Sequence, residues 1–320
     1  MSEQTNFYWG NLLHLGCNMW TENGNTRGRE HRSNSNAFTE LHFHRELWDR
    51  HIQELKDAGC NMLIIDVGEA LLYESHPELA VKGSWTHEQM RSEVEKLQGM
   101  GFEVVPKLNF SACHDIWLKE YSWMLSTSIY YQVCKDVIDE VCQVFKPKFF
   151  HLGMDEETAE HQRNFDHITV RQHDLWWKDF YYLMGCVEKH NARPWIWSDY
   201  IWNHEEAFVK NMPKSILQSN WYYYPFQQWD EKHANRNREL AGYELLDKYG
   251  YDQILTGSTW NCAENLHQTV AHGKEKISSE HLVGFMTAPW LYTDAENLYG
   301  HYCDADRLYV ARKKLYPETL

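Results

Sequence analysis

Three consecutive acidic residues stand near the middle of the sequence, directly after a short aromatic run. Asp155, Glu156 and Glu157 follow this run, which we expect to form a strand that starts at Phe149. The strand starts there because Pro147 is tolerated at a strand edge but not in its middle. Carboxylates this close repel one another, so at least one is expected to hold its proton near neutral pH. A protonated carboxyl group beside an ionised one is the arrangement that general acid catalysis requires.

The same three acids also fit a purely structural role. Acidic residues are common at the start of helices, where they interact favourably with the helix dipole. A solvated acidic loop that caps the next helix therefore stays open as an alternative at this point. Glu157 in particular is interpreted as the cap or as a solvated neighbour.

The rest of the chain alternates between strand-like and helix-like segments that must position these acids. Apolar runs predict strands at residues 11–17, 61–67, 102–109, 149–154, 194–198, 215–221, 253–260 and 282–290. Amphipathic runs predict helices at residues 40–58, 86–100, 126–145, 169–190, 205–211, 234–249, 263–277 and 295–315. This alternation predicts an α/β fold, a (β/α)8 TIM barrel that occupies residues 1–320 as a single domain without an appended domain. The acids then end the fourth strand, at the face where barrels of this type build their sites.

Further polar side chains are predicted at the same face. Asp66 and Glu69 end the second predicted strand, and Asp199 follows the fifth. Carboxylates at these positions could bind sugar hydroxyl groups. The alternative for Asp66 and Glu69 is an ion pair with Arg27 or Arg29 from the preceding loop.

Aromatic residues are abundant, with 15 Trp and 19 Tyr in the chain. Trp221, Trp260 and Trp290 end the sixth, seventh and eighth predicted strands, so we expect them to form the walls of a pocket. Aromatic rings suit sugars, whose apolar faces stack on them. The alternative for each Trp is a place in the core, where such large side chains are mostly buried.

Composition excludes several other classes of protein. The net charge of -15 argues against binding nucleic acid, because Lys and Arg dominate that affinity. No apolar run is long enough to predict a membrane span. The eight Cys include no C-x-x-C pair, and residues 1–6 do not resemble a signal peptide, so we expect a reduced, cytoplasmic protein. The oligomeric state is left open.

We predict neither a metal ion nor a cofactor. The pair His42-x-His44 has the spacing of a metal-ligand pair, but it stands where a helix is expected to begin. A helix start is the favoured interpretation of these two residues. No Cys and His spacing matches a zinc site.

The motifs in their order along the chain resemble those of the family 20 glycoside hydrolases, the β-N-acetylhexosaminidases. The main match is His151-x-Gly153-x-Asp155-Glu156, which is similar to the family's His-x-Gly-Gly-Asp-Glu at the end of strand four. The other matches are Pro77-Glu78-Leu79 with Lys82-Gly83-Ser84-Trp85, Val104-x-Pro106 followed by His114, Trp197-Ser198-Asp199, and Gly284 with Trp290.

The resemblance implies a role for several residues. Glu156 would be the general acid and base, and Asp155 would orient the 2-acetamido group of the substrate, whose carbonyl oxygen is the nucleophile. This substrate-assisted scheme departs from the usual pair of protein carboxylates. His114 would belong to a network that tunes Glu156. One of Tyr222, Tyr223 and Tyr224, which follow Trp221, would supply the hydroxyl group that binds the acetamido oxygen, with Tyr222 as our candidate.

The sequence departs from the family pattern in the part that should hold the sugar. The strand-one Arg of the family falls at Cys17, with Arg27 or Arg29 as candidates to replace it. The strand-eight Glu falls at Tyr292, and the strand-seven Tyr has no clear copy. The resemblance therefore implies the fold and the acid pair more firmly than the exact sugar.

We therefore expect a retaining exo-β-N-acetylhexosaminidase-like glycosidase that acts on small carbohydrate substrates. Two alternatives stay open. One is a glycosidase for another sugar that uses a protein carboxylate as nucleophile, with Asp66, Glu69 and Asp199 as candidates. The other is a barrel that binds sugars without turning them over.

Overall fold

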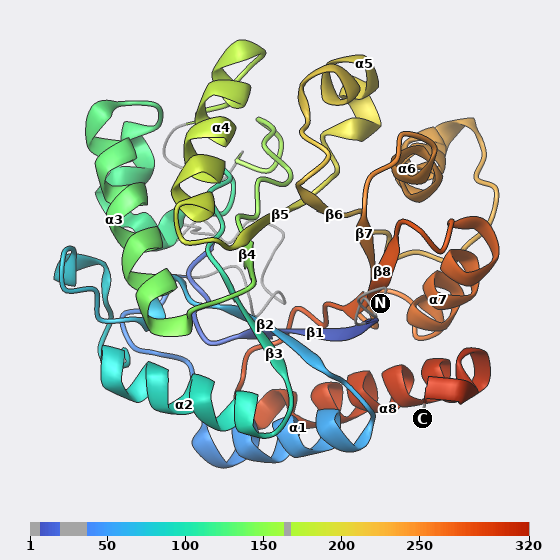
Figure 1. Cartoon of the computed structure of the whole chain (residues 1–320), viewed down its shortest axis with the longest axis horizontal. Coiled ribbons are helices and arrows are strands. Elements are labelled where there is room, and N and C mark those ends of the chain that lie inside the picture. The colour runs from blue at the N-terminus through green and yellow to red at the C-terminus, as the bar shows by residue number, and fades with distance from the viewer. Residues whose placement is uncertain (1–6, 20–36, 163–167, 320) are drawn as a thin grey trace, which may run out of the picture.

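The computed structural model describes residues 7–19, 37–162 and 168–319 of the chain. Within these residues, parallel strands form one closed barrel in the order β1-β2-β3-β4-β5-β6-β7-β8, and helices surround it (Figure 1). This confirms the predicted (β/α)8 TIM barrel. The barrel closes where β1 pairs with β8, with Tyr8 opposite Gly284.

The elements have the following bounds. The strands are β1 (Tyr8–His14), β2 (Met62–Asp66), β3 (Glu103–Lys107), β4 (Phe149–His151), β5 (Arg193–Trp197), β6 (Leu217–Ser219), β7 (Gln253–Gly257) and β8 (Leu282–Thr287). The α-helices are α1 (Arg45–Asp57), α2 (His87–Gly99), α3 (Ser128–Phe145), α4 (Asp174–Glu188), α5 (Ile201–Asn211), α6 (Ala234–Lys248), α7 (Asn265–Lys276) and α8 (Leu298–Leu315). Short 3-10 helices lie at Gly68–Ala70, Pro77–Leu79, Ile116–Met124, Glu231–His233, Ala295–Asn297 and Pro317–Thr319.

The strands are apolar on both faces, because one face lines the barrel and the other meets the helices. Neighbouring residues of a strand point to opposite faces. Leu12 and Ile64 belong to the cluster inside the barrel, whereas Leu13 and Leu63 pack in the layer between strands and helices. This explains why the strands appear in the sequence as nearly continuous apolar runs.

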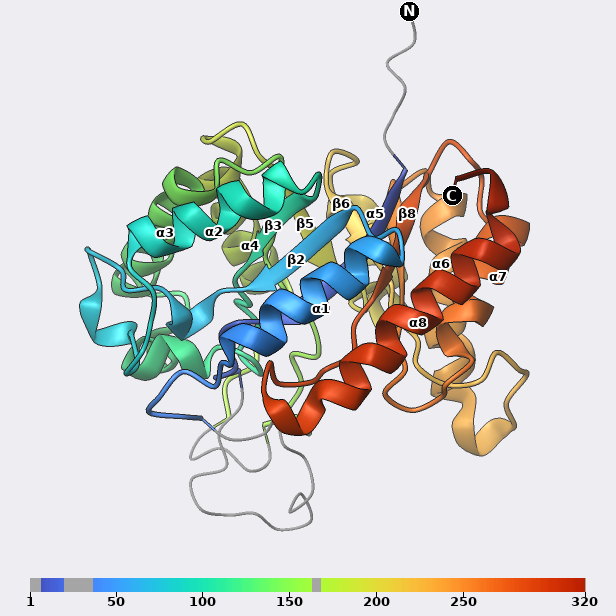
Figure 2. The same cartoon turned by 90° about the horizontal axis from the view of Figure 1, so that it is seen from below.

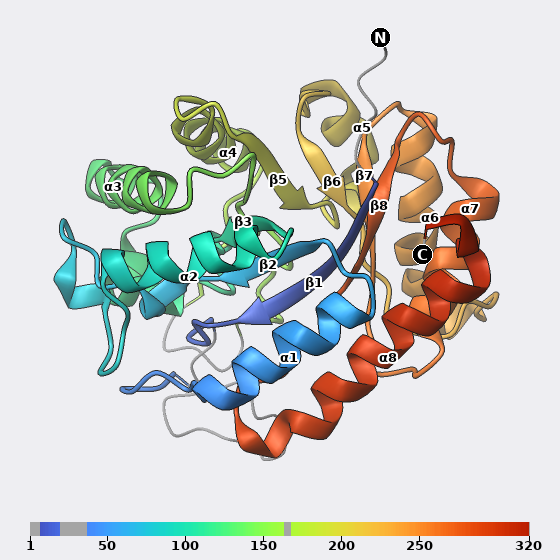
Figure 3. The same ribbon diagram turned by 60° about the horizontal axis from the view of Figure 1, so that its bottom comes forward.

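The helices form the outer ring, and consecutive helices are neighbours around it. Helices α1 and α8 lie side by side and cover the strands at the point where the barrel closes (Figures 2 and 3). Helix α2 begins with a capping box in which Thr86 and Gln89 bond reciprocally to each other's backbone N–H. That local signal agrees with the predicted start of this helix at residue 86.

Several predicted boundaries are wrong, among them those of α1, α4 and β4. Helix α1 begins at Arg45 and not at residue 40, because the ring of His44 accepts a hydrogen bond from the backbone N–H of Leu47 and caps the helix there. Helix α4 begins at Asp174 and not at residue 169. Strand β4 ends at His151, three residues before the predicted end, because the backbone turns into a left-handed conformation at Gly153.

Two further properties of the described residues bear on the expectations above. All eight Cys lie in the described part of the chain and none forms a disulfide. No helix in residues 7–19, 37–162 or 168–319 combines the length and apolar character needed to cross a membrane.

Candidate active site

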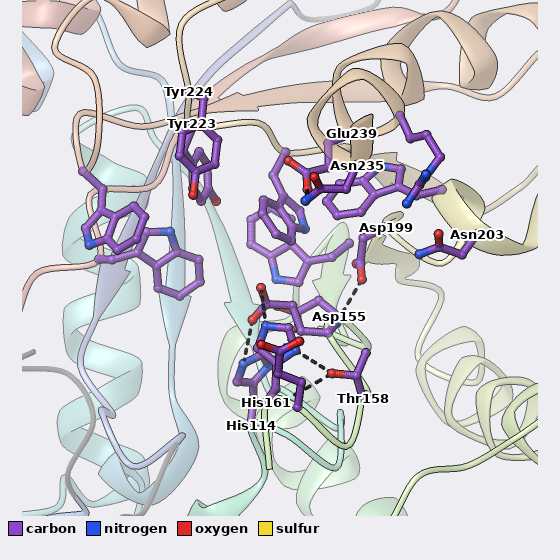
Figure 4. A pocket seen from close by; sticks show the side chains of 18 residues that line it. His114, Asp155, Thr158, His161, Asp199, Asn203, Tyr223, Tyr224, Asn235 and Glu239 are labelled. Carbon is purple, nitrogen blue, oxygen red and sulfur yellow. Dashed lines mark hydrogen bonds and ion pairs between the residues drawn. The ribbon is translucent and has the colours of Figure 1, made fainter. Parts of the chain in front are cut away.

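A cavity of about 700 Å³ opens beside the C-terminal ends of the strands (Figure 4). Its lining combines acids, imidazoles and aromatic rings from the loops after β3 to β8 and from helices α5 and α6. The lining residues are His114, Asp155, Glu156, Thr158, Glu160, His161, Trp197, Asp199, Trp202, Asn203, Trp221, Tyr223, Tyr224, Asn235, Arg238, Glu239, Trp260 and Trp290. A volume of this size is typical of sites for small organic ligands.

The backbone after β4 is shaped to present the acids to this cavity. Gly153, Met154 and Glu156 have φ values of 72°, 72° and 54°, in the left-handed region. A Cβ atom at Gly153 would lie 2.0 Å from the side-chain oxygen of Asn109, so only glycine fits there. Left-handed conformations of residues other than glycine are costly and are concentrated at functional sites.

Asp155 is buried at the bottom of the cavity, and one of its carboxylate oxygens is held by two neighbouring side chains. Its Oδ1 accepts a hydrogen bond of 2.9 Å from Nδ2 of Asn109 and lies 3.3 Å from Nδ1 of His114. Burial opposes the ionisation of Asp155, but the charge and hydrogen bond of His114 and the charge of Lys107 outweigh it. The pKa of Asp155 is therefore well below its ordinary value, and the carboxylate is ionised at neutral pH.

Glu156 lies between two imidazole rings. Its Oε2 is 3.4 Å from Nε2 of His114, and its Oε1 is 3.2 Å from Nε2 of His161. Burial raises the pKa of Glu156, but the hydrogen bonds from His114 and His161 outweigh this effect and lower the pKa to about 2. The expectation that one of the adjacent acids holds a proton is therefore wrong for Asp155 and Glu156, because the imidazoles offset their mutual repulsion.

Asp199 is the acid in the cavity that is driven toward its neutral form. Its Oδ2 accepts a hydrogen bond of 2.9 Å from the backbone N–H of Glu156, and its buried Oδ1 has no hydrogen-bond partner among the described residues. Burial and the charge of Asp155 raise the pKa of Asp199 to about 7. The structure thus places Asp199 in the site, next to the acid pair.

Glu157 has a different place from the one predicted. Its side chain is 5% exposed and forms an ion pair with the fully buried guanidinium of Arg171, with 2.5 Å between Oε2 and Nη2. Arg171 also contacts Asp179 of α4 and donates a hydrogen bond to the carbonyl of Phe110. The prediction of a cap or solvated neighbour is wrong, because this buried guanidinium requires anionic partners.

All three predicted Trp residues lie at the cavity. Trp290 lies 6.3 Å from Trp197 between ring centroids, and Trp221 packs against Trp202 at 4.7 Å. Trp260 stands at the rim with 47% of its surface exposed. The aromatic wall is therefore larger than predicted, because Trp197 at the end of β5 and Trp202 on α5 extend it.

Tyr222 does not line the cavity, whereas its neighbour Tyr223 does. The hydroxyl of Tyr222 bonds to the carbonyl of Pro225 and accepts a hydrogen bond from the indole of Trp229. Tyr224 lines the cavity as well, so the choice among the adjacent tyrosines at 222, 223 and 224 could not be made without the fold of this segment.

Asp66 and Glu69 also do not line the cavity. Asp66 is paired with Lys107 and lies 2.8 Å from Nδ1 of His14, inside the barrel. Glu69 is buried and accepts hydrogen bonds from the backbone N–H groups of Cys17 and Asn18. Their partners come from β1, β3 and the loop after β1, and Arg27 and Arg29 lie outside the described residues.

His114 bridges the two acids and is held by both. Burial lowers its pKa, but the charges of Asp155 and Glu156 and the hydrogen bonds to them outweigh this and raise the pKa to about 10. Within the described ranges, these three residues are the one group whose atoms could jointly hold a metal ion. Both ring nitrogens of His114 face carboxylates, so the same geometry also forms two ion pairs without a metal.

The pair His42-x-His44 has two separate structural roles. The ring of His44 caps α1, and Nδ1 of His42 lies 3.1 Å from Oδ2 of Asp294. The interpretation as a helix start therefore holds for His44.

Several lining residues were not predicted. His161 and Thr158 lie on the loop after β4, whereas Asn203, Asn235 and Glu239 come from α5 and α6. Figure 4 shows Glu239 and Asn235 at one end of the cavity and His114 and His161 at the other. Their position depends on how the helices and loops fold over the barrel mouth, which no spacing in the sequence reveals.

No protein-family model matches the sequence. The chain is 20% identical over 231 residues to a β-hexosaminidase of Emericella nidulans, in a match that covers 58% of this chain and 35% of that protein. It is 22% identical over 123 residues to a lacto-N-biosidase of Bifidobacterium bifidum, covering 34% and 11%. The chain thus matches about a third or less of the length of these curated relatives.

Solved structures match over nearly the whole chain. A β-N-acetylhexosaminidase from Bacteroides fragilis has a TM-score of 0.60 at 12% identity and covers 98% of this chain and 71% of its own. The N-acetyl-β-hexosaminidase of Streptomyces plicatus has a TM-score of 0.62 at 11% identity, covering 95% and 64%. Dispersin B has a TM-score of 0.60 at 12% identity, covering 96% and 99%. The chain therefore has the catalytic-barrel fold of the family 20 β-N-acetylhexosaminidases, as its motifs predict.

Proposed function

We propose that the protein is a retaining exo-glycosidase that removes terminal β-linked N-acetylhexosamine with the help of the substrate's own acetamido group. The observation that carries this proposal is the adjacent pair Asp155 and Glu156 at the bottom of an aromatic cavity. Similar proteins are named β-hexosaminidase and N-acetyl-β-hexosaminidase, which agrees with this activity.

Asp155 suits the role of orienting the acetamido group. Its carboxylate is ionised, so it accepts a hydrogen bond from the acetamido N–H and increases the electron density on the carbonyl oxygen. That oxygen attacks the anomeric carbon as the bond to the leaving oxygen breaks. Glu156 gives a proton to the leaving oxygen and then accepts a proton from the water that opens the cyclic intermediate.

The aromatic lining suits a sugar ring. Trp197, Trp221 and Trp290 present apolar faces to the cavity, and Asn203 and Asn235 add polar groups for hydroxyl contacts. Aromatic rings for apolar contact, combined with polar groups that fix orientation, are typical of sites that bind small ligands with specificity.

The two alternatives find less support. Of the three carboxylates considered as protein nucleophiles, Asp66 and Glu69 are engaged inside the barrel, and only Asp199 lines the cavity. Asp199 is driven toward its neutral form, which is a poor nucleophile. A barrel that only binds sugar would not need Glu156 between two imidazoles, where its carboxylate is poised to exchange a proton.

A cytoplasmic location and small glycosides as substrates complete the proposal. All eight Cys of the chain are free thiols, which fits a reducing compartment. Fractionation of cells that express the natural gene would test the location.

A matched pair of substrates tests the function. The wild-type protein should release nitrophenol from 4-nitrophenyl N-acetyl-β-glucosaminide and not from 4-nitrophenyl β-glucoside, which lacks the acetamido nucleophile. Glu156→Gln should lower kcat by about 10²- to 10⁴-fold, the usual contribution of a general acid and base. Equal turnover of both substrates would favour a protein nucleophile, and binding of the first without turnover would favour the non-catalytic alternative.

A further inference from the structure

The carboxylate of Glu156 has an imidazole on each oxygen, and the second imidazole belongs to no motif in the sequence. His161 lies on the loop after β4, five residues beyond Glu156, with 3.2 Å between Nε2 and Oε1. Thr158 fixes this ring, because its Oγ1 lies 2.7 Å from Nδ1 of His161 (Figure 4). The same hydroxyl oxygen accepts a hydrogen bond of 3.3 Å from the backbone N–H of His161.

The two imidazoles differ in their access to solvent. His114 is buried below the acid pair, with 2% of its side chain exposed, whereas 41% of the His161 side chain is exposed. Both rings favour the ionised form of Glu156, which must nevertheless carry a proton when the glycosidic bond breaks. In the empty site the Glu156 side chain is 27% exposed, but a substrate in the cavity covers it. The two imidazoles are then its nearest proton donors, and His161 is the one that solvent can recharge.

We propose that His161 is a positioning residue that stores the catalytic proton and passes it to Glu156 when substrate occupies the cavity. This inference rests on the proposed function. The N–H bond at Nε2 of His161 breaks and an O–H bond forms at Oε1 of Glu156, which leaves a neutral imidazole and a neutral carboxyl group. Glu156 then protonates the leaving oxygen, and the proton taken later from water returns through Glu156 to His161.

The charges around His161 favour the protonated ring. Burial and the charge of His114 lower its pKa, but the hydrogen bond to Glu156 and the charges of Glu156 and Asp199 outweigh them. Glu160 is the neighbouring acid on the same loop, and Arg238 and Glu239 face the cavity from α6. The pKa of His161 lies above its ordinary value, so the ring keeps its proton to a higher pH than a free imidazole and loses it as the pH rises further.

A comparison of two leaving groups tests this transfer. A dinitrophenolate leaves without protonation, whereas an alkoxide needs a proton. His161→Gln keeps a polar side chain of similar reach but carries no transferable proton. It should lower kcat/KM for methyl N-acetyl-β-glucosaminide at least about tenfold and leave the dinitrophenyl substrate within about twofold. The descending limb of the pH profile with the methyl substrate should move to lower pH.

Control variants separate proton supply from damage to the fold. His190→Gln changes a histidine that pairs with Asp139, away from the cavity lining, and should leave both substrates unaffected. His161→Ala leaves an opening toward solvent, where added imidazole should restore turnover of the methyl substrate.

Each outcome is decisive. If His161→Gln lowered kcat/KM for both substrates by the same factor, or for neither, the inference would be overturned while the proposed function stands. A wild-type protein that turns over neither substrate would instead refute the proposed function.

Discussion

At the scale of single residues, the carboxyl groups around the cavity differ in ionisation because they differ in partners. Asp155 and Glu156 face imidazoles and are held ionised. Asp199 has a backbone N–H on one oxygen and no partner among the described residues on the other, and it faces the charge of Asp155. An ionised acceptor, a proton-exchanging acid and an acid with a raised pKa therefore lie within one site.

The raised pKa of Asp199 makes a prediction about stability. The folded protein holds the proton of Asp199 up to about pH 7, whereas the unfolded chain releases it near pH 4. The free energy of unfolding therefore falls as the pH rises from about 4 to about 7. Above about pH 7, Asp199 makes no further contribution to its pH dependence. Asp199→Asn keeps an acceptor oxygen for the N–H of Glu156 but cannot ionise, so it should be more stable than wild type at pH 8 by roughly 2–4 kcal/mol.

Urea denaturation at pH 5 and pH 8 measures this difference. The advantage of Asp199→Asn should be small at pH 5 and larger at pH 8. A constant difference at both pH values would mean that Asp199 ionises normally in the folded protein.

At the scale of elements, the loop after β4 is held by contacts from two segments, the loop after β3 and the residues before α4. Arg171 binds Glu157 from the segment before α4, the hydroxyl of Ser111 donates to the carbonyl of Asp155, and Cys113 donates to the carbonyl of Glu156. These contacts fix the left-handed backbone that presents the acid pair. A loop without them would relax away from this costly conformation.

Removing the charge of Glu157 tests this support. Glu157→Gln weakens the bonds to Arg171 and should lower the free energy of unfolding by about 1.5–3 kcal/mol, the range for hydrogen bonds to charged groups. The value of kcat should fall as well, because Glu157 adjoins Glu156. Urea denaturation and turnover of the nitrophenyl substrate measure the two effects.

Thr86→Ala is the matched control for this variant. It removes the cap of α2 and should cost about 1 kcal/mol without changing kcat. If Glu157→Gln and Thr86→Ala behaved alike in both assays, the ion pair with Arg171 would have no special role at the site.

The sequence predicts elements better than it predicts their ends. The apolar runs and the capping box at Thr86 locate strands and helices, because periodicity and local caps are properties of short segments. The cap formed by His44 and the left-handed turn at Gly153 lie outside these patterns, so the predicted bounds of α1 and β4 are too long.

At the scale of the whole molecule, barrel closure brings the strand ends together around one cavity. Asp155, Glu156, His114, Asp199 and three Trp residues were predicted at those ends, and all line it. Asp66 was also predicted at a strand end, but it does not line the cavity. Its partners Lys107 and His14 come from neighbouring strands and hold it inside the barrel. The motif and the strand order therefore predict the centre of the site, whereas the loop and helix residues, His161 among them, depend on tertiary packing.

The stereochemistry of hydrolysis tests the central claim most directly. Proton NMR can follow the first product formed from 4-nitrophenyl N-acetyl-β-glucosaminide before the sugar equilibrates in solution. Attack by the acetamido oxygen followed by attack of water inverts the anomeric carbon twice, so the β-anomer should appear first. Initial release of the α-anomer would contradict the assignment of Asp155 and Glu156 to a substrate-assisted, retaining mechanism.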